Sequence, residues 1–528
     1  MRLLILGGTS SDYPFSRRRR REAIQNEVRY FMNSRDFWRA AARTVQTVVF
    51  LGIGVQGTPT QADTPVPLYP LGMCSNGNIF TNPDYASRLL DSGAKICRTD
   101  VVFIDVRPKP GDDPNAWNWR EMESVAKKHQ EHPDLDFLVL LGYGAPWADD
   151  ARFAAVKGAE IAGGQRGIDV MPAWSKGNLY GHYVYETVRR YKNVVHTWES
   201  WNEPDLPGHA FFKGAGRDFF AYQKACYLAA KQADPHCTVL FAGMCYANIE
   251  GYLFNHKLKP PTPYPPKECF FEDYLKACVQ DPDAKKNHYY FDVMSQHSYS
   301  RATDLYDYAM VDRKLMHDYL GEEKPIWFTE MGFPDQGGLL GGSADDYCDY
   351  LLQSFAWGRR ADVERFFHFQ LDNSNTLGLY TGMLGDPKPA LTTYRDVLAK
   401  EFAGARLVAQ QHGNAGVGFL QGHSPFQPTW TTGYNLFAFQ SGTRKLWMAF
   451  TDTDKAVDIT IPAKRAQAIL VDRHNHRTPI TAHNGVYALK LPGAANRTGW
   501  PTLTDPVARA LGEPEHLVGG ATLVLIEE

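Results

Sequence analysis

The chain has 528 residues, a length that predicts two or three domains. It carries 56 lysines and arginines against 59 aspartates and glutamates, so it lacks the basic excess typical of proteins that bind nucleic acid. Hydrophobic residues make up 44% and charged residues 22%, a balance that excludes a wholly disordered chain. The unusual feature is an aromatic fraction of 13%.

The N-terminal segment has the order of charged and apolar residues of a secretory signal. Arginines between residues 35 and 43 precede an apolar run at 45–55, and small residues follow to Ala62. The run is too short to span a membrane, which takes about 20 apolar residues. We therefore expect residues 1–62 to be an export signal with an extension, and the protein to be secreted or periplasmic without stable membrane insertion. A buried helix is the alternative.

The segment that begins at Met32 resembles a twin-arginine export signal, but one of the paired arginines is missing. A general secretory signal fits equally well.

None of the eight cysteines has a C-x-x-C or C-x-x-H spacing, which many zinc sites have. We therefore expect no metal and no cofactor. Export would permit disulfides, but their pairing does not follow from the spacing. Cys97 lies within an apolar segment, where we expect a small buried hydrophobic residue.

From about Pro67 to Ala403, short apolar segments alternate with amphipathic helical ones, which predicts parallel strands and helices. The predicted helices include Leu179–Tyr191, Phe219–Gln232 and Ala344–Arg360. The eight predicted strands are Tyr69–Met73, Lys95–Phe103, Phe137–Tyr143, Val194–Trp201, Thr238–Met244, Phe291–Gln296, Ile326–Thr329 and Phe366–Leu371.

Eight strand–helix units predict an α/β fold, a (β/α)8 TIM barrel over residues 63–403. A doubly wound sheet is the alternative, and it would require a glycine-rich phosphate turn after an early strand. The one early candidate, Leu6-Gly7-Gly8-Thr9, lies in the presumed targeting segment.

After about Gly404, short strand segments separated by turns replace the helices. This pattern predicts a smaller all-β sandwich domain over residues 404–528. The predicted strands are Tyr434–Phe439, Lys445–Thr451, Ala456–Ile461, Ala468–Val471, Val486–Leu491 and Ala521–Ile526.

Polar residues end several predicted barrel strands, where barrels place their reactive groups. Glu203 follows the fourth strand and Glu330 the seventh, so a closed barrel brings them to opposite sides of one mouth. Two carboxylates are the minimum equipment for cleaving a glycosidic bond. One donates a proton to the leaving oxygen, and the other attacks the anomeric carbon or activates water.

The strings Trp201-Asn202-Glu203-Pro204 and Trp327-Phe328-Thr329-Glu330-Met331-Gly332-Phe333 resemble motifs of the retaining glycoside hydrolases of clan A. The resemblance covers roughly residues 65–403 and is nearest in style to family 39. It implies that Glu203 is the general acid/base and Glu330 the nucleophile. It also implies that Asn202 binds the sugar 2-hydroxyl.

Three further residues resemble clan A positions around the nucleophile. Arg98, at the end of the second strand, resembles the arginine beside the nucleophile, where a guanidinium keeps a carboxylate ionised. His297 and Tyr299 resemble the pair after the sixth strand, where the tyrosine hydroxyl orients the nucleophile.

Tryptophan faces cover the apolar C–H faces of sugars, and Trp147 and Trp174 follow the third strand. We expect both to contact substrate, whereas Trp198 and Trp357 are expected in the core. Many clan members have a tryptophan at the end of the eighth strand, and this chain has none there. The innermost sugar site is therefore expected to be walled by Gln370 or by a loop residue.

The sequence thus predicts a retaining glycoside hydrolase that cleaves β-linked poly- or oligosaccharides by double displacement. Two alternatives remain. One is a transglycosylase with the same site, and the other is a carbohydrate-binding protein without activity, which would need neither carboxylate.

Overall fold

The computed structural model describes residues 69–528 with several gaps, so the predicted export segment at 1–62 lies outside the described residues. Within the described part, no helix is both long enough and apolar enough to cross a membrane. All eight cysteines are buried free thiols, Cys97 among them. The gaps are residues 76, 110–111, 114, 257–268, 336–341, 374–375, 383, 413–432 and 496–515.

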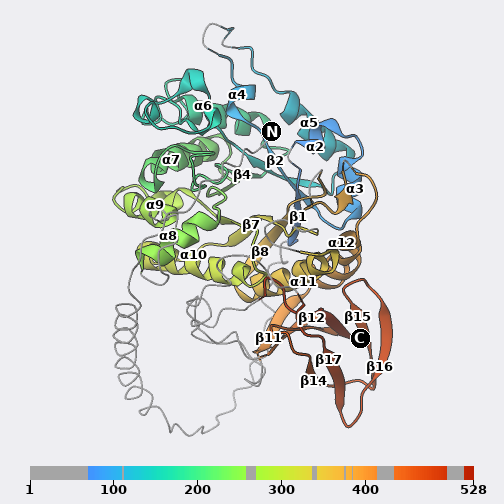
Figure 1. Ribbon diagram of the computed structural model, residues 1–528. Helices are drawn as coiled ribbons and strands as arrows, with labels where there is room; N and C mark the ends of the chain where they lie inside the picture. The colour runs from blue at the N-terminus through green and yellow to red at the C-terminus, as the bar shows by residue number, and fades with distance from the viewer. Residues whose placement is uncertain are drawn as a thin grey trace, which may run out of the picture. The chain divides into compact units, whose positions relative to one another are not determined.

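Eight parallel strands form a closed barrel (Figure 1). Each of β1 to β4 pairs with the next strand, as do β6 and β7, and β1 also pairs with β8. Parallel bridges from Leu240 to Val293 and from Met244 to Gln296 complete the ring between β5 and β6. The TIM barrel is therefore confirmed. Its strands are β1 (Leu71–Cys74), β2 (Ile96–Asp100), β3 (Asp136–Leu140), β4 (Thr197–Glu199), β5 (Thr238–Leu240), β6 (Met294–Ser298), β7 (Ile326–Met331) and β8 (Val363–His368).

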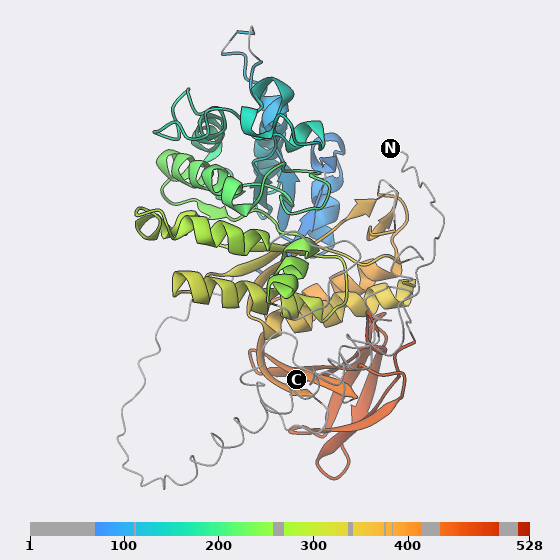
Figure 2. The ribbon, with the colours of Figure 1, turned by 60° about the vertical axis from the view of Figure 1, so that its left-hand side comes forward.

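Helices follow the barrel strands along the chain, and Figure 2 shows several of them packed side by side. In α6 (Leu179–Tyr191) the buried residues include Tyr180, Tyr183, Val184 and Thr187, at the spacing of one helix face, and α6 packs against α7. The other α-helices are α2 (Asn78–Thr81), α3 (Tyr85–Asp91), α4 (Phe103–Val106), α5 (Arg120–Glu131), α7 (Gly216–Ala233), α8 (Tyr246–Asn255), α9 (Phe270–Cys278), α10 (Asp304–Leu320), α11 (Ala344–Arg360) and α12 (Pro389–Thr392).

The C-terminal region is an antiparallel β-sandwich with a six-stranded and a two-stranded sheet. Both sheets bury apolar side chains in one cluster that includes Trp447, Ile461 and Tyr487. The larger sheet has the order β11-β12-β13-β18-β15-β16, and β14 pairs with β17. The strands are β11 (Arg406–His412), β12 (Tyr434–Ser441), β13 (Arg444–Thr451), β14 (Val457–Pro462), β15 (Gln467–Asp472), β16 (Arg477–Thr481), β17 (Val486–Leu491) and β18 (Leu523–Glu527).

Two strands of the sandwich, β11 and β16, were not predicted. Both lie at edges of the six-stranded sheet. Edge strands bury little surface, and the β16 sequence RTPIT is almost wholly exposed. The hydrophobic pattern that reveals the inner strands is therefore absent from it.

The sandwich is hydrogen-bonded to α11 of the barrel. The Gln353 amide nitrogen donates to Gly520 O and Thr522 Oγ1, both at 3.0 Å, and its oxygen accepts from Gly519 N at 2.8 Å. Arg473, after β15, forms ion pairs with Asp345 and Asp349 of the same helix.

Candidate active site

Arg98 lies at the centre of the polar groups at the barrel mouth. From β2 its Nη1 donates to Glu330 Oε1 on β7 at 2.7 Å, and its Nη2 donates to Asn202 Oδ1 at 3.0 Å. Its Nε donates to Glu199 Oε2 at the end of β4, at 2.6 Å. The guanidinium is 2% exposed, so little water screens these contacts. One side chain thus links three strand ends.

Glu330 has donors on both carboxylate oxygens. Arg98 occupies Oε1, and the Tyr299 hydroxyl donates to Oε2. Burial by itself would raise the pKa of Glu330, but the positive charges of His297 and Arg98 and the hydrogen bond from Tyr299 outweigh it. The net pKa lies below the usual glutamate value, which keeps this carboxylate ionised.

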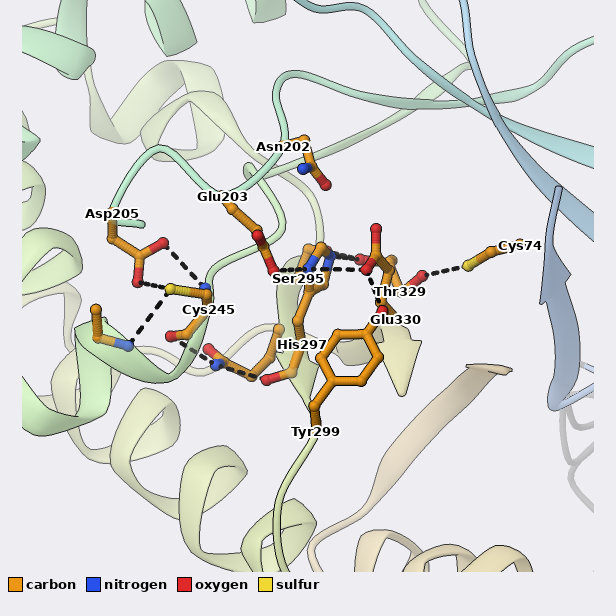
Figure 3. Close-up of polar contacts among 12 residues, drawn as sticks. Cys74, Asn202, Glu203, Asp205, Cys245, Ser295, His297, Tyr299, Thr329 and Glu330 are labelled. Carbon is orange, nitrogen blue, oxygen red and sulfur yellow. Dashed lines mark hydrogen bonds and ion pairs between the residues drawn. The ribbon is translucent and has the colours of Figure 1, made fainter. Parts of the chain in front are cut away.

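His297 lies between the two glutamates (Figure 3). Its Nδ1 is 3.0 Å from Glu203 Oε1 and 3.7 Å from Glu330 Oε2, and its Nε2 is 3.1 Å from Thr329 Oγ1. Burial would lower the pKa of His297, but the adjacent Glu330 and Glu203 raise it above the usual histidine value. The imidazole can therefore hold a proton between the two carboxylates.

Glu203 and Glu330 are close enough to act on one anomeric carbon. One carboxylate oxygen of each lies within 4.8 Å of the other. Carboxyl groups about 5–5.5 Å apart are typical of retaining glycosidases, and gaps of about 6.5–9.5 Å are typical of inverting ones. The approach of one oxygen from each carboxylate to within 4.8 Å lies on the short side of this division.

Glu203, His297 and Glu330 also offer three possible metal-ligand atoms within 4.8 Å of one another. These side chains already have protein partners, since Glu203 and Thr329 contact the imidazole, and Arg98 and Tyr299 contact Glu330. The Arg98 charge, 2.7 Å from Glu330, also opposes the approach of a cation. These residues fit a hydrogen-bonded network better than a metal centre.

Glu199 is a third carboxylate of the site to which sequence reasoning assigned no role. It is fully buried and accepts hydrogen bonds from Arg98 Nε, from Ser295 Oγ at 2.5 Å and from Thr329 Oγ1 at 2.7 Å. Its negative charge balances that of Arg98. A glutamate within an apolar strand was the available signal, because buried carboxylates are rare without a partner.

A cleft of about 480 Å³ opens over Glu203 and Glu330. Its walls combine aromatic rings with carboxylates. The other lining residues are Gly77, Phe80, Asp100, Val102, Glu121, Tyr143, Asn202, Phe211 and Phe369.

The structure does not place Trp147, Trp174 or Gln370 along this cleft. Trp147 stacks on Phe103 with ring centroids 5.3 Å apart, and Trp174 is partly buried against the barrel core. Gln370 is 4% exposed, and the ring of the preceding residue, Phe369, lines the cleft instead.

The cleft rings Phe80, Tyr143 and Phe211 come from segments that follow strands; Tyr143 ended the predicted third strand, whereas β3 ends at Leu140, and no strand pattern points to Phe80 or Phe211. Trp198 and Trp357 lie in the core, as predicted, with at most 1% exposure.

No protein-family model matches the chain, and no curated protein matches it. Solved structures do share its fold. A family 39 glycoside hydrolase from Bacteroides cellulosilyticus WH2 is 15% identical with a TM-score of 0.55, and the match covers 88% of this chain and 81% of that one. A family 39 β-xylosidase from Caulobacter crescentus is 12% identical with a TM-score of 0.53, over 89% and 98% of the two chains.

A family 39 enzyme from Xanthomonas axonopodis pv. citri is likewise 12% identical, with a TM-score of 0.52 over 87% and 94% of the chains. The chain therefore has the fold of family 39 glycoside hydrolases, as its motifs predicted.

Proposed function

We propose that the protein is a retaining glycoside hydrolase that cleaves β-glycosidic bonds in a poly- or oligosaccharide. The observation that carries this proposal is the short gap between Glu203 and Glu330 at the cleft, where one oxygen of each carboxylate lies within 4.8 Å of the other. The two carboxyl groups have different neighbours, as a nucleophile that must be ionised and a proton donor require: Arg98 and Tyr299 contact Glu330, and His297 contacts Glu203. The fold shared with family 39 enzymes, among them a β-xylosidase, supports the same conclusion.

In the first step, ionised Glu330 attacks the anomeric carbon. The glycosidic C–O bond breaks, and Glu203 donates a proton to the departing oxygen. The products are a glycosyl ester on Glu330 and a free alcohol. Arg98 and Tyr299 favour this step because they hold the Glu330 carboxylate ionised and fix its orientation.

In the second step, Glu203 removes a proton from water, which attacks the anomeric carbon and releases Glu330. Two inversions leave the configuration unchanged. Asn202 is oriented for the sugar 2-hydroxyl, since Arg98 Nη2 donates to its oxygen and leaves the amide nitrogen to donate to substrate.

The cleft lining favours a substrate without strong negative charge. Four aromatic rings, those of Phe80, Tyr143, Phe211 and Phe369, offer apolar surface to sugar C–H faces. Among the described lining residues there is no lysine or arginine to pair with an acidic sugar.

Replacement of the nucleophile tests this proposal. Glu330→Ala should lower hydrolysis of an aryl β-glycoside by at least about 10⁴-fold, because the covalent intermediate no longer forms. Added azide should restore part of the turnover by taking the vacated place, and the product should be the α-glycosyl azide. Full hydrolysis by the variant without azide would contradict the assignment.

We also propose that the protein is exported. The arginines at 35–43 and the apolar run at 45–55 support this. Mass spectrometry of the protein from its native cells should find a mature chain that starts near Asp63. An intact residue 1–62 segment on the cellular protein would refute export by cleavage.

A further inference from the structure

Glu203 has a backbone conformation that side-chain-bearing residues seldom adopt. Its φ is 39°, in the left-handed region, which costs about 1–2 kcal/mol for a residue with a Cβ. Such a conformation persists only where surrounding contacts enforce it. One contact is local to the loop, since Leu206 N donates to Glu203 O at 3.1 Å. Another crosses to the segment after β5, where Gly243 O accepts from Glu203 N at 2.7 Å.

Asp205, two residues further on, binds the start of α8. Its Oδ1 accepts from Cys245 N at 2.9 Å, and its Oδ2 accepts from Asn248 N at 2.8 Å. The Cys245 thiol lies 3.2 Å from the same Oδ2. N–H groups at a helix start are short of intrahelical acceptors, and Asn248 N has only Cys245 O at 3.3 Å, so a carboxylate from another loop caps them. Figure 3 shows Asp205 beside Cys245, on the side of Glu203 away from Glu330.

Cys245, which Asp205 contacts, is also linked to the residues of the active site. Gln296 Nε2 donates to Cys245 O at 3.3 Å, and the next residue, His297, contacts Glu203. The contacts therefore run from Asp205 through Cys245 and Gln296 to the residue next to it, His297, which contacts Glu203. Burial, with the nearby charge of Glu203, raises the pKa of Asp205 to about 7, so the ionised carboxyl is held in this buried place at a cost that the N–H groups of Cys245 and Asn248 partly offset.

We infer that Asp205 is a positioning residue for the proton donor, and that it holds the Glu203 loop against α8 so that the Glu203 carboxyl meets the leaving oxygen. The inference rests on the proposed function. Asp205 does not line the cleft. Without it Cys245 N loses this acceptor, Asn248 N keeps only its longer contact with Cys245 O at 3.3 Å, and the strained backbone at Glu203 is free to relax. A displacement of about 1 Å at a catalytic group can cost about 100-fold in rate.

The test compares two aryl glycosides of the sugar that the wild type hydrolyses fastest. Phenol needs a proton from Glu203 as it leaves, whereas 2,4-dinitrophenolate needs almost none. Asp205→Ala should lower kcat/KM for the phenyl glycoside about 100-fold and change the rate of bond cleavage in the dinitrophenyl glycoside, measured before steady state, less than about threefold. Asp205→Asn keeps one acceptor oxygen, so its loss should be intermediate.

Asp273→Ala is the matched control. Asp273 also accepts a backbone N–H at the start of another helix, Arg217 N at 2.8 Å, and it does not line the cleft. It should lower the melting temperature and leave the ratio of the two substrates unchanged.

Equal losses on both substrates in Asp205→Asn, which keeps one of the two capping acceptors, would reduce Asp205 to a structural role and overturn the inference alone. A folded wild type without turnover on any aryl glycoside would overturn the proposed function together with this inference.

Discussion

The two glutamates at the barrel mouth differ in their hydrogen-bond partners. Arg98 and Tyr299 donate hydrogen bonds to Glu330, and its pKa is lowered. The Glu203 carboxylate contacts the His297 imidazole instead, and no arginine or lysine of the described residues contacts it. Different surroundings for two neighbouring carboxylates divide the roles of nucleophile and proton donor. These surroundings support the proposed assignment of Glu330 as the nucleophile and Glu203 as the proton donor.

Loss of the Tyr299 hydroxyl should change the pH dependence of catalysis. Tyr299→Phe removes one donor from Glu330, so the pKa of the nucleophile rises toward its usual value. The free enzyme must have Glu330 ionised, and the acidic limb of the kcat/KM profile should therefore move to higher pH. At the optimum, kcat/KM should fall about tenfold, the worth of one hydrogen bond to a charged group.

Tyr319→Phe is the control for this change. The Tyr319 hydroxyl also donates to a carboxylate, that of Glu272 at 2.8 Å, away from the cleft lining. Its pH profile should match that of the wild type. An unmoved acidic limb in Tyr299→Phe would show that the hydroxyl does not govern the ionisation of Glu330.

The apolar pattern of the sequence predicted the barrel strands and several of the helices. The barrel strands are buried on both faces, so they read as continuous apolar runs, and α6 and α11 have the bounds that their periodicity predicts. Arg98, Asn202, Glu203, His297, Tyr299 and Glu330 came together because parallel strands end at one rim.

Features set by tertiary context were not predictable in this way. The cleft rings Tyr143 and Phe211 come from loops, whose course depends on packing that no periodicity encodes. Trp147 and Trp174, which were expected to contact substrate, are not among the residues that line this cleft and are partly buried against the barrel core. The role of Glu199 could not be predicted, because its partners Arg98, Ser295 and Thr329 lie on three other strands.

Gly243, which follows β5, lets the backbone pass against His297. A Cβ at this position would lie 2.2 Å from His297 Nε2, and contacts with Thr329 and Glu203 hold the ring. Gly243→Ala should therefore displace the imidazole, lower kcat/KM about 100-fold and destabilise the fold by about 1–3 kcal/mol. Steady-state kinetics and urea unfolding measure the two effects.

Gly404→Ala is the control, since a Cβ there would meet no atom within 4 Å. Its stability should stay within about 0.5 kcal/mol of the wild type. Wild-type kinetics in Gly243→Ala would show that the position of His297 is not fixed by this contact.

For the whole molecule, the high aromatic content mainly reflects a large core. Trp201 packs edge-on against Tyr180, Phe212 and Tyr222, and all four rings are fully buried. Trp117 and Trp119 stack on each other at 5.2 Å. Among the described residues only a small set of rings lines the cleft, so composition alone could not distinguish sugar-binding rings from packing ones.

The stereochemistry of the first product tests the central claim most directly. Proton NMR during the first minutes of hydrolysis of a β-glycoside identifies the anomer released before mutarotation. Double displacement through Glu330 predicts that the β-anomer appears first and the α-anomer grows in later. Initial release of the α-anomer would mean a single displacement by water, and it would contradict the assignment of Glu330 as nucleophile.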